Sequence, residues 1–533
     1  MIIFPTLRKP IQALCCAVSV ALAGPLAALA DPGGLVVIAV DAASGRALAG
    51  VRVEVTYRGG ESAQALSDIR GEARFEQLEE GFYSVAARAE GRALTLEPTF
   101  RVIARRMSAL ELQLPPLDAS FAPAPDAPIE EVVVVARARQ ADELAGVSSA
   151  FRNRDELRNA VGAGSDVMRA LDGLPGLASD GGFANFTVRG RGPRNNLIFV
   201  DDFPLDKVVH FDQTIGEDDD IAGGGRFSIF APNSVSGAEF SPGGWGAAYG
   251  GRAGSLLRLE LADGGLTPVT SLRLDVAGAE LTYDGPSGFS DDTSVFFTAR
   301  SFDFGNVFEL IDQEDIGTPE VTDIILKTTT DLGDRNELEF LFIHAPEKFT
   351  RDLKNVAASE DFEDVSLIRS EQDLSLFGAT WRRMVGSAGE WTNRLYLRSS
   401  DKDSAQGEAF PDLAAAGAPA SAIPAREDIF AIQEQEQEIG WRSDFSTFNR
   451  FGEFSAGLRV VNLDAEYETS LDGPWIRYVY ETDDPRPEGQ KFIVWLPETI
   501  ESSFSRRGTN VAAYAEQVFE LASFDFRPGL RVD

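Results

Sequence analysis

Three short segments between Asn185 and Arg258 decide how this chain is interpreted. They are Phe186–Gly190 (FTVRG), Leu197–Pro204 (LIFVDDFP) and Ala248–Gly254 (AYGGRAG). Across the stretch that they mark, short apolar segments, which are typical of strands, alternate with glycine-rich turns and isolated arginines. Because glycine permits tight turns and close approach of the backbone, this pattern predicts a small domain packed tightly against its surroundings.

The order and spacing of these motifs resemble the plug domain of TonB-dependent outer-membrane transporters. The segment Asp166–Gly176 resembles the family's short helix followed by Leu-Pro-Gly. The resemblance implies a plug over residues 140–263, no cofactor and no covalent chemistry, so the chain is expected not to be an enzyme.

The N-terminus, residues 1–30, reads as a secretory signal. Arg8 and Lys9 precede an apolar stretch, and Ala28-Leu29-Ala30 is a small-x-small cleavage site. A membrane anchor is the alternative, but Gly24-Pro25 interrupts the apolar run. Both cysteines, Cys15-Cys16, lie in this segment, so the mature chain is expected to contain no disulfide and no thiolate site.

The composition excludes one class of partner. The formal net charge is −35, with 84 acidic and 49 basic residues, whereas phosphate binding requires a basic face. Nucleic acid is therefore not an expected partner. After residue 30 no apolar stretch approaches the roughly 20 residues of a membrane helix, but a transmembrane barrel strand requires only about 10.

Residues 31–115 predict a small β-sandwich. Val51, Val53 and Val55 alternate with polar residues, as expected for strands with one buried face. The Asp-x-x-Gly and Gly-x-Tyr motifs at Asp68–Gly71 and Gly81–Tyr83 resemble those of the carboxypeptidase-regulatory-like domain, a transthyretin-type sandwich. The resemblance implies a non-catalytic periplasmic module.

A proline-rich linker is predicted at residues 116–128, followed by a segment that looks like a TonB box at 129–139. The residues expected to bind the partner are Ile129, Glu130, Glu131, Val132, Val133, Val134 and Val135. A β-branched run can add as an edge strand to a partner's sheet. The alternative is a first plug strand that stays folded.

Residues 264–533 show the alternation expected of amphipathic strands. Arg394, Tyr396 and Arg398 alternate with Leu395 and Leu397. One face suits lipid and the other a wet lumen, although a soluble sandwich with one solvated face has the same period. Alternating long loops and tight turns favour the outer-membrane barrel.

The expected fold is mainly β: a transthyretin-like sandwich, a mixed α+β plug domain and part of a 22-stranded antiparallel transmembrane β-barrel. A plugged barrel of about 22 strands requires on the order of 450 residues. The region 264–533 has 270. We therefore expect the barrel to be C-terminally incomplete at Asp533.

Few residues suit catalysis. His210 and His344 are the two histidines, and neither accompanies a nucleophile elbow. His344 and Glu347 match the His-x-x-Glu of zinc carboxypeptidases, but no later histidine supplies a third ligand. The acidic run Glu217–Asp220 is expected to be a solvated loop rather than a calcium site. No metal site is predicted.

Two arginines are candidates for a latch between plug and barrel. Arg189 and Arg252 each lie beside glycine in motifs that the family uses at this contact, where they are expected to pair with carboxylates of the barrel wall. Lys207, His210 and Phe211 are candidate ligand contacts, because loops near them face outward in the family. A structural plug loop is the alternative.

The preferred hypothesis is an outer-membrane receptor that binds a scarce ligand and imports it with energy from the inner-membrane proton gradient. By the resemblance, its partners are the TonB–ExbB–ExbD energy-coupling complex, outer-membrane lipid and a small-molecule, glycan or peptide ligand. The second hypothesis is a non-transporting surface protein for adhesion or ligand binding. A carboxypeptidase-like enzyme is the third, weakened by the missing histidine.

Overall fold

The structure is a computed structural model of the whole chain. It describes residues 33–41, 46–57, 62–79, 81–92, 94–102, 107–114, 133–135, 149–158, 160, 166–179, 186–211, 227–231, 233–265, 268–290, 292–333, 335–358, 366–386, 389–409, 425–449, 451–480, 490–496, 498–521 and 524–533. The predicted signal, the proline-rich linker, the acidic run at 217–220 and residues 129–132 of the predicted TonB box lie outside these ranges.

The N-terminal region forms two sheets around one apolar core that includes Val53, Val55 and Phe75, as the alternation predicts. The first sheet has the order β4-β1-β7 and the second β3-β2-β5-β6-β8. The strands are β1 (Gly33–Asp41), β2 (Arg52–Tyr57), β3 (Ser62–Leu66), β4 (Glu72–Leu78), β5 (Gly81–Arg88), β6 (Leu94–Val102), β7 (Met107–Leu114) and β8 (Val133–Val135). Kinship with carboxypeptidase-regulatory-like domains stays a prediction.

The plug is built on a five-stranded sheet with the order β13-β12-β17-β16-β9. Its elements are β9 (Ala150–Asn153), α2 (Arg154–Arg158), η2 (Arg169–Leu171), β10 (Leu177–Ser179), β11 (Phe186–Val188), η3 (Pro193–Asn195), β12 (Leu197–Val200), β13 (Phe203–Pro204), β14 (Val209–His210), β15 (Phe227–Ser228), β16 (Val235–Ser241) and β17 (Leu256–Leu261). The short helical turn at η2 is capped by Asp166, whose Oδ1 accepts hydrogen bonds from the backbone N–H groups of Met168 and Arg169.

A long sheet follows, with the order β18-β19-β20-β21-β22-β24-β25-β26-β27-β30-β33 and β23 pairing with β21 and β24. Its elements and those of its loops are β18 (Val269–Leu274), β19 (Gly278–Pro286), β20 (Thr293–Asp303), α3 (Gly305–Leu310), η4 (Glu314–Ile316), β21 (Thr318–Asp331), β22 (Asn336–His344), β23 (Glu347–Arg351), α4 (Leu353–Ala358), β24 (Ser366–Val385), β25 (Gly389–Ala409), β26 (Ala425–Asn449), β27 (Gly452–Leu471), β28 (Trp475–Tyr480), β29 (Gln490–Leu496), β30 (Ile500–Gln517), β31 (Phe519–Leu521), β32 (Phe524–Phe526) and β33 (Gly529–Val532). We call this sheet the wall.

The wall has one polar and one apolar face, as the alternation predicts. On β25, Leu395 and Leu397 are about half exposed, whereas Arg394 and Tyr396 face the plug and are buried. Among the described residues, no helix is long and apolar enough to cross a membrane. The mainly β fold with a plug beside a large antiparallel sheet is confirmed; closure into a barrel and the number of 22 strands stay predictions.

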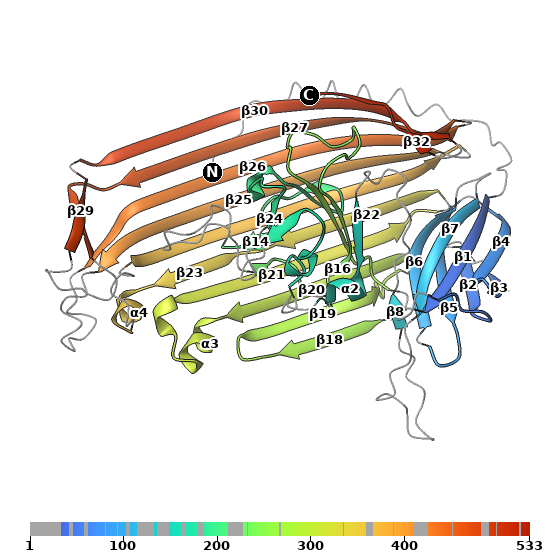
Figure 1. Cartoon of the computed structure of the whole chain (residues 1–533), viewed down its shortest axis with the longest axis horizontal. Helices are drawn as coiled ribbons and strands as arrows, with labels where there is room; N and C mark the ends of the chain where they lie inside the picture. The colour runs from blue at the N-terminus through green and yellow to red at the C-terminus, as the bar shows by residue number, and fades with distance from the viewer. Residues whose placement is uncertain are drawn as a thin grey trace, which may run out of the picture.

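The plug lies against one face of the wall, and both contribute to one apolar core (Figure 1). Ile325, Leu341 and Leu376 of the wall belong to the same buried cluster as Val200 and Phe203 of the plug. The helices α3 and α4 and the β28–β29 hairpin lie at one end of the wall, and the N-terminal sheets lie beyond the other end (Figure 1). Along the wall, the plug therefore lies between these loop elements at one end and the N-terminal sheets beyond the other end (Figure 1).

Candidate functional site

A buried histidine joins the plug to two strands of the wall. His210, which ends β14, is 1% exposed. Its Nε2 atom lies 2.8 Å from Asp323 Oδ1 on β21, and its Nδ1 atom lies 2.9 Å from Glu347 Oε2 on β23. The next residue, Phe211, has φ of +54°, which is rare for a bulky side chain, and its backbone N–H donates to the same Glu347 oxygen over 2.9 Å. Two carboxylates therefore face both ring nitrogens, as suits a protonated imidazole.

Arg300 on β20 extends this contact to the next plug strand. Its Nε atom lies 2.5 Å from Asp323 Oδ2. Its terminal nitrogens donate to the backbone carbonyl oxygens of Ser228 and, over 3.1 Å, Phe230. The wall therefore holds both arms of the β14–β15 pair. We call His210, Arg300, Asp323 and Glu347 the histidine clamp.

The clamp predicts a specific pH dependence of stability. Burial alone lowers the pKa of His210, but the carboxylates of Asp323 and Glu347 outweigh burial and raise this pKa to about 9, from 6.5. Since the folded-state pKa is the higher one, the stabilisation is full below about pH 6.5 and is lost as pH rises through about 9. A thermal melt series between pH 6 and 10 should therefore show a fall that the His210→Gln variant lacks; parallel profiles would contradict the assignment.

A lysine of the wall is buried between two aspartates. Lys327 Nζ on β21 lies 2.9 Å from Asp201 Oδ2 in the plug and 2.6 Å from Asp263 Oδ1, which follows β17. All three side chains are less than a tenth exposed. Burial raises the pKa of Asp201 to about 6, although the Lys327 ammonium opposes this rise. The carboxylate is thus costly to bury, and its pairing with Lys327 offsets part of that cost.

Two further aspartates from the same plug turn face arginines of β25. Asp202 Oδ2 accepts from Arg394 Nη2 over 2.6 Å, and Asp206 pairs with Arg398. Burial opposes ionisation of Asp202, but Arg258, Arg394 and the nearby Arg442 hold its pKa well below the usual range. The segment 201–206 therefore supplies three carboxylates that pair with three cations of the wall.

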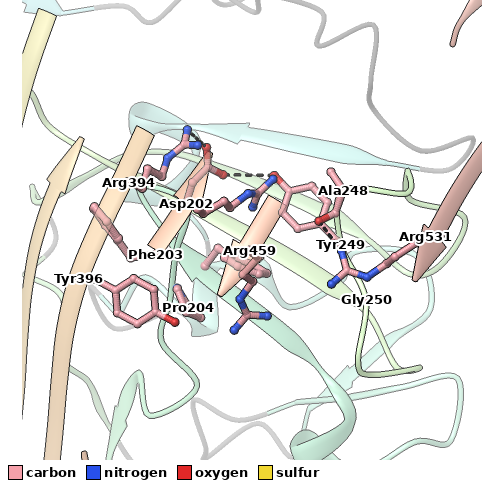
Figure 2. A pocket seen from close by; sticks show the side chains of 12 residues that line it. Asp202, Phe203, Pro204, Ala248, Tyr249, Gly250, Arg394, Tyr396, Arg459 and Arg531 are labelled. Carbon is pink, nitrogen blue, oxygen red and sulfur yellow. Dashed lines mark hydrogen bonds and ion pairs between the residues drawn. The ribbon is translucent and has the colours of Figure 1, made fainter. Parts of the chain in front are cut away.

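A small pocket lies where this turn meets the wall (Figure 2). Its residues come from the plug turns and from β25, β26, β27 and β33, and they are Phe199, Asp202, Phe203, Pro204, Ala248, Tyr249, Gly250, Arg394, Tyr396, Arg442, Arg459 and Arg531. Arg442 stacks over Tyr249, with its guanidinium carbon 5.1 Å from the ring centroid. Four guanidinium groups thus line one small space.

The two arginines of the predicted latch make their contacts within the plug in the structure. Arg252 donates to the backbone oxygen of Arg194 over 2.7 Å and to Asp206 Oδ2 over 2.8 Å, both within the plug. The side chain of Arg189 lies beside Gly176 and Gly243, also in the plug. Neither arginine pairs with a wall carboxylate among the described residues. The prediction placed the cations on the plug, whereas at this turn the plug supplies aspartates and the wall supplies the cations.

The three candidate ligand contacts lie at the plug–wall boundary. His210 is buried in the clamp and offers no surface to a ligand in this structure. Phe211 packs edge-on against Phe349 of β23, with the ring centroids 6.1 Å apart. Lys207 donates to Ser400 Oγ over 3.0 Å and lies 4.0 Å from Glu434. Their role in ligand binding stays a proposal, and Lys207 is less enclosed than His210.

Of the predicted TonB box at 129–139, the structure describes only Val133–Val135. These residues form β8, which pairs in parallel with Leu94–Leu96 of β6 at the edge of the N-terminal sheet. The segment is therefore paired within its own chain here, and its binding to a partner protein stays a prediction.

The described residues contain no group of three or more histidine, cysteine, aspartate or glutamate side chains placed to hold a metal ion. The two residues of the zinc-like pattern, His344 and Glu347, contact different partners. His344 Nδ1 lies 2.9 Å from Ser375 Oγ, whereas Glu347 is bound to His210. The two side chains therefore serve different contacts, and the geometry of the structure gives no support to the carboxypeptidase hypothesis.

Comparison with known proteins identifies the plug. The family described as TonB-dependent Receptor Plug Domain matches residues 143–255, within the predicted range of 140–263. No curated protein sequence matches this chain.

Several solved structures resemble the chain at low sequence identity. They include the outer membrane transporter YddB from Escherichia coli (TM-score 0.48, 8% identity, 72% of this chain and 56% of that one). FpvA from P. aeruginosa bound to heterologous pyoverdines has a TM-score of 0.48 and 14% identity, over 72% and 51%. The siderophore receptor PiuA from Acinetobacter baumannii has a TM-score of 0.45 and 11% identity, over 72% and 57%. The chain spans little more than half the length of these proteins.

Proposed function

The chain carries the plug domain of a TonB-dependent outer-membrane receptor, and from that premise we propose that it imports a scarce extracellular ligand into the periplasm. The plug domain match is the observation that carries this proposal. The packing of the plug on the polar face of the wall supports it, because a movable plug beside a wet wall can close and open a passage.

Transport of this kind requires an energy source from outside the outer membrane. We assign that role to the TonB–ExbB–ExbD complex, driven by the inner-membrane proton gradient, with Ile129–Val135 as the segment that the complex grips. Backbone pairing of an edge strand gives such a grip without a deep pocket. The edge position of β8 supports this assignment. The N-terminal sandwich is then periplasmic.

Proline at the centre of the predicted box should abolish coupling. Val134→Pro removes a backbone N–H that strand pairing uses, so we expect loss of binding to the periplasmic domain of TonB and loss of uptake. Val134→Thr keeps a β-branched residue and should preserve both. Co-purification and uptake by whole cells measure the effect. Uptake that survives Val134→Pro and deletion of 129–135 would falsify this mechanism.

The second candidate is an outer-membrane protein that binds a ligand or surface without transport. It predicts ligand binding with no interaction between residues 129–135 and the TonB domain. The Val134→Pro experiment separates the two, because only the transporter loses a measurable interaction.

A further inference from the structure

Two arginines lie directly opposite each other on neighbouring wall strands. Arg442 of β26 and Arg459 of β27 are cross-strand partners, and both line the pocket beside the plug. Figure 2 shows Arg459 in this pocket. Like charges at directly opposed positions of a sheet destabilise it. A negatively charged group is therefore expected to offset the repulsion between these two guanidinium groups. The nearby carboxylates are the first candidates.

The nearest carboxylates already serve other groups. Asp444 Oδ2 lies 2.7 Å from Arg442 Nε and 3.0 Å from Arg394 Nη1, and its Oδ1 accepts from Tyr514 over 2.8 Å. Asp444 thus satisfies one side of Arg442 but is not paired with Arg459.

The other carboxylates around the pocket are occupied in the same way. Asp202 accepts from Arg394, Arg258 and Tyr249. Asp533 accepts from Arg531 through both of its oxygens, over 2.9 and 3.0 Å from Nε. Neither forms an ion pair within 4 Å with Arg459 among the described residues, although Asp533 is near enough to interact with it electrostatically.

Arg459 forms no ion pair within 4 Å with a carboxylate among the described residues. It lies near the hydroxyl of Tyr396, which itself donates to Glu438, and near enough to the Asp533 carboxylate to interact with it electrostatically. A second donor is also unused: Arg394 is 9% exposed, and its Nε has no hydrogen-bond partner among those residues. The pocket thus holds cationic donors in excess of the acceptors that face them.

We propose that this pocket binds an oxyanion, a phosphate or carboxylate group, between Arg442 and Arg459. Guanidinium groups recognise such groups through charge-assisted, often bidentate, hydrogen bonds. The site lies between plug and wall, on the face turned away from lipid, so its ligand is a soluble anion rather than a lipid headgroup. It does not depend on the proposed transport.

Titration of the purified full-length protein in detergent with inorganic phosphate, and separately with acetate, tests the site. Line broadening in the ³¹P spectrum and a shift in melting temperature should report saturable phosphate binding, with a dissociation constant of about 1 mM or below. Arg459→Gln should weaken binding by at least about tenfold, the effect of one lost charge-assisted contact. Arg459→Lys keeps the charge and should lose less.

The matched control is Arg507→Gln on β30, which removes the same charge from a side chain 84% exposed and paired with Asp464. It should leave binding unchanged. Phosphate and acetate that both fail to bind, or equal binding by the Arg459→Gln and Arg507→Gln variants, would overturn the site. Circular dichroism of each variant separates loss of the site from loss of the fold.

Discussion

Replacing His210 with alanine is expected to weaken the attachment of the plug to the wall by about 3–5 kcal/mol, because it leaves buried carboxylates without their partner. Asp323 and Glu347 are each less than a tenth exposed, and Arg300 compensates only Asp323. Phe211 also loses its neighbour while its backbone remains in a rare conformation. The loss should appear as faster amide exchange at residues 205–211 and 227–230.

His344→Ala is the matched control, since among the described residues His344 makes one hydrogen bond, to Ser375, and no hydrogen bond or ion pair with the plug. It should change exchange in the plug little. In cells, the His210→Ala protein should admit bulky antibiotics that the parent and the control exclude. Unchanged exchange in the His210→Ala variant would show that the clamp does not hold the plug.

Much of the fold was predictable because its signals are local. The alternation of Arg394, Leu395, Tyr396 and Leu397 predicts which face of β25 is polar, and the structure confirms this. The plug motifs predict their own strands, since apolar runs and glycine turns act over a few residues. Asp201 and Asp202 both have positive φ, a backbone conformation that aspartate adopts more readily than most residues. The turn at these positions is therefore also predictable from the sequence.

The partners across the plug–wall boundary were not predictable from local patterns. His210 is separated from Asp323 by 113 positions and from Glu347 by 137, and no periodicity links residues so far apart. Because local patterns do not reveal these partners, the sequence predicts a ligand contact for a histidine near an outward-facing loop. The same limit applies to the predicted arginine latch. Arg189 and Arg252 are distinctive in the sequence because glycine flanks them, whereas no local pattern distinguishes the aspartates at 201–206 from ordinary turn residues.

The contacts between the plug and the wall differ in how deeply they are buried. The histidine clamp and Lys327 are buried, so breaking them leaves charges without water or partners. The Asp206 carboxylate, which pairs with Arg252 and Arg398, is more than a third exposed. Breaking an exposed ion pair costs little, because water replaces the lost partner. We therefore expect the plug to separate from the wall first near Asp206, and last at the clamp and at Lys327.

A leucine at Gly378 of β24 is expected to displace the plug turn from the wall. A Cβ atom there would lie 2.6 Å from two ring carbons of Phe203, which is 2% exposed and packed edge-on against Tyr396. The ring of Tyr396 packs in turn on Gly440 of β26. Overpacking of this kind costs about 1–3 kcal/mol. Urea unfolding of the plug, followed by limited proteolysis, measures the loss.

The second substitution Phe203→Ala identifies the cause. Alone it should destabilise the plug by about 3–5 kcal/mol, because it removes a buried ring. Combined with Gly378→Leu it should cost less than the sum of the two single changes, because the new side chain fills the space that the ring leaves. Gly508→Leu on β30 is the control, since an added Cβ there meets no atom within 4 Å. Strictly additive effects at 203 and 378 would mean that the wall glycine does not make room for the plug phenylalanine.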